Sequence, residues 1–392
     1  MKSDKSTPNV PTLRFAEYTD EWHKFALSDF VTRITRRNKN NESSLPLTIS
    51  AQYGLVDQIT FFNKTVASVD LSGYYLLYNG DFAYNKSYSN DYAWGAVKRL
   101  DKYEKGCLSS LYFVFRPKDS VDSDYLTHYF ETKKWHKGIS DIAGEGARNH
   151  GLLNMAVDDY FVTKHFLPAI DEQKKIAAFL NKIEKRIDIQ NKIISKYETL
   201  IKGIRHRIFS CVANRRMETL GSFLEEYSEK NTANNLQSVA VGKYGIRKRE
   251  DIYSKELSSD YSKNKVIRKD TLIIGMGSTQ IDIGILTTDN CYCVSPAYTT
   301  YRIKGIDSFY LQEYLIDLNP LLSVRYMVTS ARQGKAVNKD DLMQHHLAIH
   351  SDLEQEKIHQ FFQHIYGGLL IEKRMLSALQ KQKAFLIQSM FI

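Results

Sequence analysis

Four short motifs contain residue types that carry out chemistry in other proteins, and none of the motifs is complete. Gly242-Lys243 and Gly334-Lys335 lack the following Ser or Thr and the upstream glycine of a phosphate-binding loop. Gly275-Met276-Gly277 is a fragment of a dinucleotide fingerprint, and two glycines in a loop are commoner than a cofactor site. The "NPLL" segment at 319–322 lacks the second proline and the aromatic residue that hold a flipped base in amino-methyltransferases.

Other reactive residue types are isolated as well. Cys291 and Cys293 form a lone C-x-C with no second ligand pair nearby, so we interpret them as strand residues rather than a zinc site. His345-His346 is most simply an exposed pair, and no nucleophile–histidine arrangement or spaced carboxylate pair stands out. We therefore predict a binding protein with no catalytic residue, no metal and no cofactor.

The charge balance indicates what such a protein binds. The 392 residues include 54 Lys and Arg against 45 Asp and Glu, which gives a net charge of +9 and a pI of about 9.0. This balance favours a polyanionic partner without proving one. The first residues, "MKSDKSTPNVP", lack the apolar core of a signal peptide, and no run of eighteen apolar residues could span a membrane. We expect a cytoplasmic protein.

Two long helices are the elements with the strongest periodicity. Alternating steps of four and three meet an apolar residue at nine of ten positions over 176–208, and at eight of ten over 358–390. This is the spacing of a coiled coil. The polar residues Gln190 and Glu372 fall at the same step of each series, so we predict that they fix the register. The matching phase favours mutual packing of the two helices, although each could pack separately on its own domain.

The globular segments before the two helices repeat one another. The offset between matching residues falls steadily from 193 to 182, as duplication followed by loop shortening would leave it. The matches include Leu27 with Leu220, "QYGL" (52–55) with "KYGI" (243–246), Gly95 with Gly284, "SLYFVFR" (110–116) with "PAYTTYR" (296–302), Arg148 with Arg332, and Glu172-Gln173 with Glu354-Gln355.

Alternating aromatic and β-branched residues indicate that both globular segments are rich in strands. Examples are "GYYLLYNGDFAYNK" (73–86) and "KVIRKDTLIIGMG" (265–277), and short helices are expected at 123–135 and 307–318. We predict an α+β chain with four parts. Two β-rich domains, at 1–168 and 215–350, alternate with two long helices, at 169–214 and 351–392, which pack as an antiparallel coiled coil.

This order of elements resembles the specificity (S) subunit of type I restriction-modification enzymes over nearly the whole chain. The resemblance rests on "DEWHKFALSDF" (20–30), "GDFAYNKSYS" (80–89), "KDTLIIGMGS" (269–278), and the segment Leu167-Pro168-Ala169-Ile170-Asp171-Glu172-Gln173 before the first long helix. The second copy departs from this pattern, because His350 stands where the first has Pro168.

The resemblance implies a function for each part. The globular domains would be target recognition domains, each reading one half of an interrupted, asymmetric DNA sequence. The helices would be a spacer and a docking surface for two methyltransferase (M) subunits, which bind S-adenosylmethionine and methylate adenine at N6. Two restriction (R) subunits using ATP and Mg²⁺ would complete the nuclease. The chain itself would be a non-catalytic subunit.

Reading DNA requires side chains that position phosphates and side chains that reach base edges. In the first domain we predict DNA contacts from Arg36, Arg37, Lys86, Tyr88, Arg148 and Asn149. In the second domain we predict them from Arg247, Lys248, Ser278, Gln280, Arg332, Gln333 and Lys335. Any of these clusters could instead be a solvated loop, and Arg148 and Arg332 could be structural residues at the domain–helix junction.

Two other functions fit parts of the sequence. The coiled coil could hold apart two modules for ligands other than DNA, in which case salt-dependent DNA binding would be absent. A fused methyltransferase–specificity enzyme is disfavoured, because both methyltransferase motifs are missing. The bases that are read and the gap between half-sites depend on loops, so the sequence does not determine them.

Overall fold

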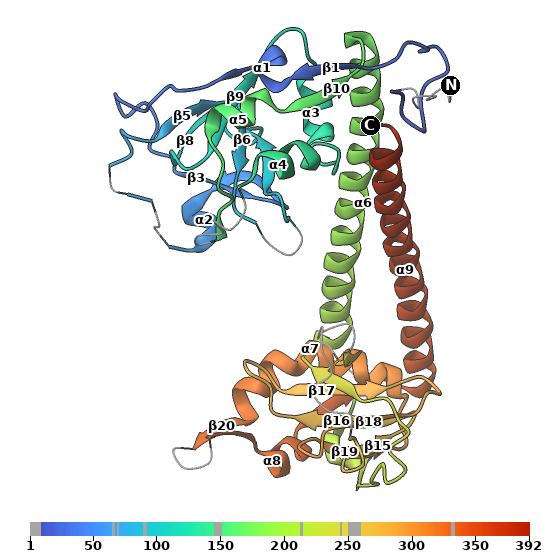
Figure 1. Cartoon of the computed structure of the whole chain (residues 1–392). Coiled ribbons are helices and arrows are strands. Elements are labelled where there is room, and N and C mark those ends of the chain that lie inside the picture. The colour runs from blue at the N-terminus through green and yellow to red at the C-terminus, as the bar shows by residue number, and fades with distance from the viewer. Residues whose placement is uncertain are drawn as a thin grey trace. The chain divides into compact units, whose positions relative to one another are not determined.

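The computed structural model describes residues 9–64, 67–68, 70–88, 92–144, 151–211, 215–243, 245–249, 260–330 and 334–392. The chain forms two compact units, one of Met1–Asn191 with Met375–Ile392 and the other of Lys192–Arg374. Each unit combines a β-rich domain with one half of each long helix (Figure 1). The predicted domain boundaries at residues 168, 214 and 350 stay a prediction, because the boundaries between the two units fall inside the long helices.

The first unit is built on a four-stranded antiparallel sheet. Its strand order is β2 (Val31–Arg33), β9 (Phe113–Pro117), β6 (Phe82–Asn85) and β7 (Ala96–Arg99). Three antiparallel pairs surround it: β1 (His23–Ala26) with β10 (Lys164–Leu167), β3 (Leu47–Ser50) with β4 (Gly54–Asp57), and β5 (Tyr75–Tyr78) with β8 (Lys105–Leu108). The short helices are α1 (Leu27–Phe30), α2 (Gln58–Phe62), α3 (Ser123–Tyr129), α4 (His136–Ile142) and α5 (Val157–Val162).

The second unit has a four-stranded sheet of the same kind. Its strand order is β12 (Leu224–Tyr227), β19 (Thr299–Ile303), β16 (Thr271–Gly275) and β17 (Asp282–Leu286). The antiparallel pairs are β11 (Arg216–Thr219) with β22 (His346–Ile349), β13 (Val239–Gly242) with β14 (Gly245–Lys248), β15 (Lys265–Ile267) with β18 (Tyr292–Val294), and β20 (Met327–Ser330) with β21 (Gly334–Val337). The helices of this domain are η2 (Leu220–Phe223), the 19-residue α7 (Ser308–Tyr326) and α8 (Lys339–Met343).

The two strand orders confirm the repeat. Hairpins β3–β4 and β13–β14 also match. The second strand of each begins with a glycine of positive φ, 79° at Gly54 and 99° at Gly245. This backbone conformation favours glycine. One match is wrong. Asn85 pairs with Ala96 and Gly275 pairs with Asp282, so Gly95 corresponds to the residue before Asp282 rather than to Gly284.

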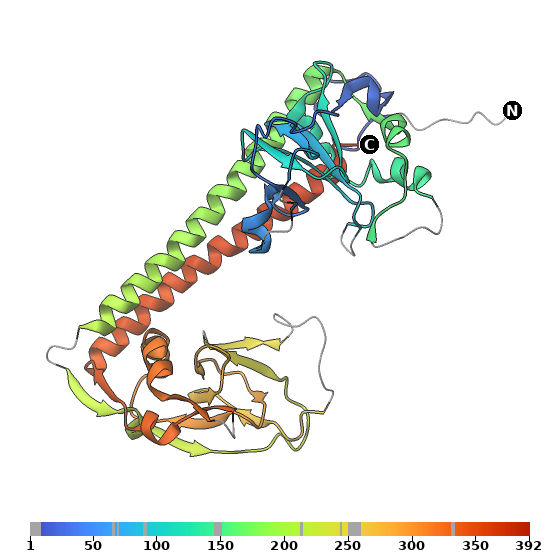
Figure 2. The same cartoon turned by 90° about the vertical axis from the view of Figure 1, so that its left-hand side faces the viewer.

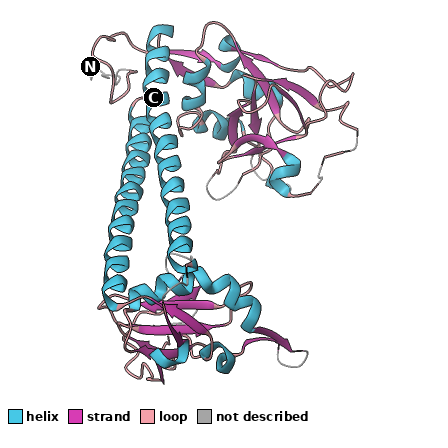
Figure 3. Ribbon diagram, turned by 180° about the vertical axis from the view of Figure 1, so that it is seen from behind, coloured by secondary structure: helices cyan, strands magenta, loops and turns pink. Residues whose placement is uncertain are grey.

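The two long helices, α6 (Ile170–Ser210) and α9 (Asp352–Ser389), follow the predicted seam. Every seam position in 176–208 and 358–390 is buried or half-buried. In each unit a half of α6 lies beside a half of α9 (Figure 3). Gly367-Gly368 does not interrupt α9. Gln190 is buried in the first unit and Glu372 is half-buried in the second, and their role in setting the register stays a prediction.

A phenylalanine at the C-terminal end of each long helix packs among aromatic rings of a β-rich domain: Phe209 is in the last turn of α6, and Phe391 follows α9 by two residues. In the first unit the ring centroid of Phe391 lies 5.2 Å from Tyr125 and 6.1 Å from Tyr129. In the second unit Phe209 lies 5.4 Å from Tyr310 and 4.5 Å from Tyr314. Because burial of an aromatic side chain stabilises strongly, each phenylalanine fixes a helix end on its domain.

The segment before β1 joins the end of α9 to the start of α6 in the first unit (Figure 2). The backbone N–H of Leu13 donates to the carbonyl of Ser389 at 3.0 Å. The guanidinium of Arg14 donates twice, at 2.7 Å each, to the buried carboxylate of Glu172. In the described part of the chain, no helix is both long and apolar enough to span a membrane.

Candidate nucleic-acid interface

A buried glutamine fixes the start of each long helix to its domain. Gln173 Nε2 donates to the carbonyl of Pro168, and its Oε1 accepts from the N–H of Asp122, the N-cap of α3. Gln355 does the same in the second unit with the carbonyl of His350 and the N–H of Asp307, the N-cap of α7. The turn is therefore kept although proline is replaced by His350, because the contact uses a backbone carbonyl that every residue has.

Two predicted DNA contacts of the first unit are held against aromatic rings. The guanidinium of Arg36 lies 4.3 Å from the ring of Tyr78 and donates to Asp81 at 2.8 Å. The guanidinium of Arg37 lies 4.1 Å from the ring of Tyr75. Arg36 thus contributes to the domain's own structure, and its role in binding DNA stays a prediction, as does that of Arg37.

Asp81 is a residue whose importance sequence reasoning missed. It is fully buried, and it forms ion pairs with Arg36 at 2.8 Å and with Arg116 at 2.6 Å. Its side chain also accepts a hydrogen bond from the N–H of Tyr78. The only signal in the sequence was its place after Gly80, in a turn between two strands.

The turn with Lys86 and Tyr88 is paired to a segment distant in sequence. The N–H of Leu153 donates to the carbonyl of Lys86, and the N–H of Tyr88 donates to the carbonyl of Gly151. Lys86 Nζ lies 4.9 Å from the ring of Phe113, and burial lowers its pKa. Arg148 and Asn149, in the six residues before Gly151, lie outside the described residues.

Three predicted residues of the second unit are brought together. Lys335, on β21, donates from Nζ to the carbonyl of Ser278 at 3.0 Å. Gln280 and Lys335 line a cavity of about 480 Å³ together with residues of α7 and β20, the strand that Figure 1 shows at the edge of this unit. Arg332 and Gln333, between β20 and β21, lie outside the described residues.

The loop that carries Ser278 and Gln280 is pinned to α7. The N–H of Ile281 donates to Ser323 Oγ at 2.9 Å, and Asn319 Nδ2 donates to the carbonyl of Ile281 at 3.0 Å. Asn319 and Ser323 are both buried. The asparagine of the "NPLL" segment therefore has a structural role, holding a loop of the candidate interface.

Arg247 and Lys248 lie on β14. Both side chains are exposed, and both line a cavity of about 310 Å³ that β14 forms with β17 and the loop after it. Strand positions with exposed basic side chains suit contacts to DNA phosphates.

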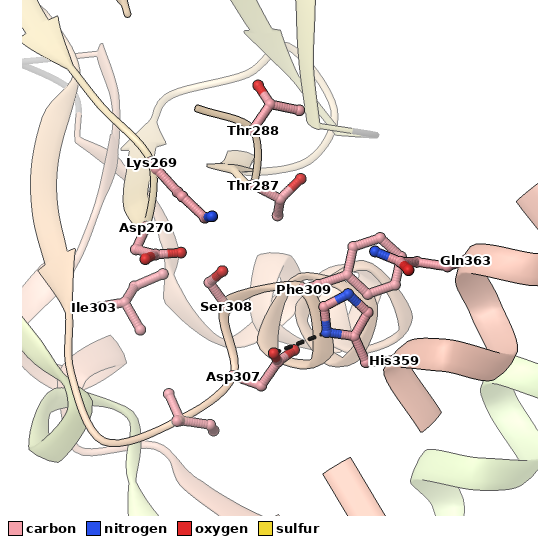
Figure 4. Close-up of a pocket in the computed structure, with 11 residues that line it drawn as sticks. Lys269, Asp270, Thr287, Thr288, Ile303, Asp307, Ser308, Phe309, His359 and Gln363 are labelled. Atoms are coloured by element: carbon pink, nitrogen blue, oxygen red, sulfur yellow. Dashed lines mark hydrogen bonds and ion pairs between the residues drawn. The ribbon is translucent and has the colours of Figure 1, made fainter. Parts of the chain in front are cut away.

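A larger cavity, of about 580 Å³, lies in the second unit between the β-rich domain and α9 (Figure 4). His359 Nδ1 lies 2.9 Å from Asp307 Oδ2, and its ring stacks on Phe309 at 4.6 Å. Asp307 Oδ1 accepts from the N–H of Tyr310, so this carboxylate is a helix cap. The aspartate–histidine pair thereby joins α7 to α9. In the described part of the chain, no group of three or more His, Cys, Asp or Glu is placed to hold a metal ion.

The fold is that of the S subunits of type I restriction-modification systems. The chain aligns with a TM-score of 0.57 to a chain from a study of complex assembly and conformational transition of the type I R-M system, at 16% identity over 93% of this chain and 96% of that chain. It aligns with a TM-score of 0.53 to the type I restriction-modification system S subunit from M. genitalium, at 14% identity over 98% and 99%.

A third solved structure, the HsdS subunit from Thermoanaerobacter tengcongensis, aligns at 15% identity over 96% of this chain and 98% of that chain, with a TM-score of 0.46. No family model and no curated protein matches the sequence. The fold thus agrees with the resemblance seen in the sequence.

Proposed function

We propose that this chain is the DNA-reading subunit of a type I restriction-modification complex. Each β-rich domain reads one half of a bipartite, asymmetric DNA target. The chain also docks two methyltransferase (M) subunits and restriction (R) subunits, which carry out adenine-N6 methylation or DNA cleavage. In this proposal the chain itself has no catalytic residue and needs no cofactor.

One observation carries the proposal: two domains of the same strand order place polar and basic loops at the same point of the fold. In the first domain this loop follows β6, and in the second it follows β16, which has the same place in the sheet. Each loop contacts a segment that comes after a stretch with an arginine, Arg148 or Arg332. In the first domain Lys86 and Tyr88 meet Gly151 and Leu153. In the second, Ser278 meets Lys335. Two equivalent polar surfaces suit two half-sites.

The proposed mechanism divides these side chains by their chemistry. Lys335, Arg247 and Lys248 would contact phosphates, because lysine and arginine on exposed strands provide positive charge without base specificity. Ser278 and Gln280 would reach base edges, because hydroxyl and amide groups can both donate and accept hydrogen bonds. The fold likeness to S subunits does not favour the alternative, a scaffold for ligands other than DNA.

The test is co-expression of the chain with its M partner, followed by methylome sequencing and DNA-binding measurements. We expect N6-methyladenine at one bipartite motif, and no methylation by the chain alone. Lys335→Ala should lower the salt dependence of binding by about one phosphate contact. Lys304→Ala, at an exposed lysine paired with Glu225 in the same unit, is the matched control. Turnover by the isolated chain, or salt-independent binding, would contradict the proposal.

The long helices offer a second test of the same proposal. One heptad added to both α6 and α9 keeps the seam in phase and lengthens each helix by about 10 Å, or roughly three base pairs. We expect both half-site sequences to be kept and their gap to widen, if the M subunits tolerate the change. A variant that still methylates only the original spacing would show that the helices do not set the gap.

A further inference from the structure

An exposed aromatic cluster lies on the first domain, where β4 leads into α2. Tyr53, Phe61 and Phe62 are 60%, 43% and 44% exposed. The ring centroids of Tyr53 and Phe61 are 6.4 Å apart, and those of Phe61 and Phe62 are 5.0 Å apart, both edge to face. Ile59, 45% exposed, adds to the same short helix. We call these four residues the α2 cluster. Exposed apolar patches of this kind mark interaction sites.

The backbone that presents the α2 cluster is held by specific contacts. Asp57 caps α2, because its carboxylate accepts from the N–H groups of Ile59 and Thr60 and from the hydroxyl of Thr60. These bonds lower the pKa of Asp57, led by the one from the Thr60 hydroxyl. Asn63 closes the helix with a positive φ of 51°. The aromatic side chains therefore project from a capped helix, and the carboxylate of Asp57 is engaged in capping.

The matching hairpin of the second domain carries basic side chains. Hairpin β13–β14 matches hairpin β3–β4, with Gly245 equivalent to Gly54 and Lys248 equivalent to Asp57. Arg247 and Lys248 are exposed and Arg249 is half-buried where the chain leaves β14. Arg247 and Lys248 match Val56 and Asp57 of β4, and the residues that match Phe61 and Phe62 lie outside the described residues. The same hairpin thus leads into aromatic side chains in the first domain and ends on basic side chains in the second.

We propose that the α2 cluster contacts the DNA half-site of the first domain as an apolar wedge that packs against a base step. The proposal rests on the proposed function, since it assumes that both domains bind DNA with the same face. The matching hairpin of the second domain then binds phosphates through Arg247 and Lys248. Apolar side chains inserted at a base step partly unstack it and kink the duplex, and stacking on aromatic rings tolerates any base.

The two kinds of contact have different salt dependence. A phosphate contact releases counterions, so its loss reduces the slope of log K against log salt concentration by about one. An aromatic wedge releases none. Its loss should weaken binding by roughly tenfold and leave that slope unchanged.

The test uses the full chain in complex with its M partner and a duplex carrying the motif found by methylome sequencing. Phe61→Ala and Phe62→Ala should each raise Kd by roughly tenfold with no change in salt slope. Arg247→Ala and Lys248→Ala should raise Kd and reduce the slope. Leu111→Ala, at a leucine 62% exposed in the same unit, is the matched control and should leave Kd unchanged. Phe61→Leu keeps an apolar side chain and should retain an intermediate affinity.

A fluorescent base reports the wedge directly. With 2-aminopurine placed in turn at each position of the first half-site, the wild-type complex should raise the fluorescence at one step by unstacking it, and Phe61→Ala should abolish the rise. Wild-type affinity and fluorescence in both Phe→Ala variants would overturn the wedge while the proposed function stands. Loss of the M partner from those variants would overturn it too, by identifying the α2 cluster as a protein interface. If the wild-type complex does not bind DNA, the proposed function itself is wrong.

Discussion

Glu313 and His128 occupy the same position in the two units, six residues into α7 and α3, and both are buried. Glu313 forms an ion pair at 2.8 Å with Arg205 of α6 and accepts from the hydroxyl of Tyr366 of α9. His128 shares a 2.8 Å hydrogen bond with Asn181, and burial lowers its pKa, which favours the neutral ring. One unit buries a charged pair where the other buries a neutral one.

The difference shows that the contact of α3 or α7 with the long helices requires a paired polar side chain rather than a particular charge. Phe209 and Phe391 are separated by the same 182 residues as Gln173 and Gln355, so Ile387 of the first unit corresponds to Arg205 of the second. Ile387 is apolar and buried in the core of the first unit, where His128 stands in place of the carboxylate of Glu313. Both members of the pair must therefore change together, since a buried charge without a partner is costly.

The largest effect should follow from breaking the charged pair. Arg205→Ile leaves Glu313 buried beside Tyr366 alone and should cost about 3 kcal/mol of the free energy of unfolding of the second unit. Adding Glu313→His, which copies the first unit, should recover most of that loss. Urea unfolding followed by circular dichroism measures both. All three tryptophans lie in the first unit, so their fluorescence transition should stay unchanged. Equal losses in the single and double variants would contradict the comparison.

The first unit should be the more sensitive to acid, because of His165. Thr163 Oγ1 donates to the carbonyl of Tyr160 and so accepts from His165 Nε2–H, which leaves Nδ1 to accept from the hydroxyl of Tyr129. Burial lowers the pKa of His165 to about 4. At the equivalent position the second unit has Leu347.

The sign follows from the direction of that shift. A buried neutral histidine, whose pKa is lower in the folded state, adds to the free energy of unfolding. This contribution is complete above the unfolded pKa of about 6.5 and is lost as pH falls toward 4. The loss should reach about 3 kcal/mol in the first unit. His165→Gln should flatten the pH dependence of the tryptophan fluorescence transition between pH 7 and 4.5. The same pH dependence in both proteins would show that other groups cause the acid sensitivity.

Asp81 provides a third contrast. The register of the sheets makes Thr271 its equivalent, and Thr271 is a neutral residue that lies 2.7 Å from the hydroxyl of Tyr227. Asp81→Ala should destabilise the first unit by about 2–3 kcal/mol, because it removes the charge-assisted hydrogen bond from Arg36 and the ion pair with Arg116. Thr271→Ala should cost the second unit only about 1 kcal/mol. Thermal unfolding followed by tryptophan fluorescence and by circular dichroism separates the two, and equal losses would remove the contrast.

The smallest effect concerns the glycine pair Gly367-Gly368 of α9, which the matching stretch of α6 lacks. Apart from the neighbouring residues of α9 itself, no described atom lies within 4 Å of where a Cβ would stand at Gly367, and at Gly368 the nearest is the ring of Tyr197 at 3.5 Å. Both sites accept alanine, so Gly367→Ala should raise the free energy of unfolding by about 1 kcal/mol, and Gly368→Ala by a similar amount or less. Calorimetry on the two variants measures this, and a lower melting temperature would show that a glycine is required there.

Periodicity and internal repetition determined the architecture from the sequence alone. The steps of four and three over 176–208 and 358–390 predicted α6 and α9, because a helix that packs on another must place apolar side chains along one seam. Matches such as "QYGL" with "KYGI" predicted two repeated domains, and the structure has a glycine with positive φ at this match in both. These patterns are local or periodic, so a single sequence reveals them.

Only the tertiary structure decided which polar residues serve the fold and which remain for a ligand. Arg36 was predicted as a DNA contact, but its guanidinium reaches Asp81, a residue 45 positions away that no periodicity connects to it. Lys335 and Ser278, 57 positions apart, meet because Asn319 and Ser323 hold the loop against α7. The rings of Phe61 and Phe62 on α2 stay exposed, whereas other aromatic rings of the same domain, such as those of Phe82 and Tyr84, are buried. Hydrogen-bond partners and exposure depend on which segments the fold brings together, and the spacing of residues along the chain does not specify them.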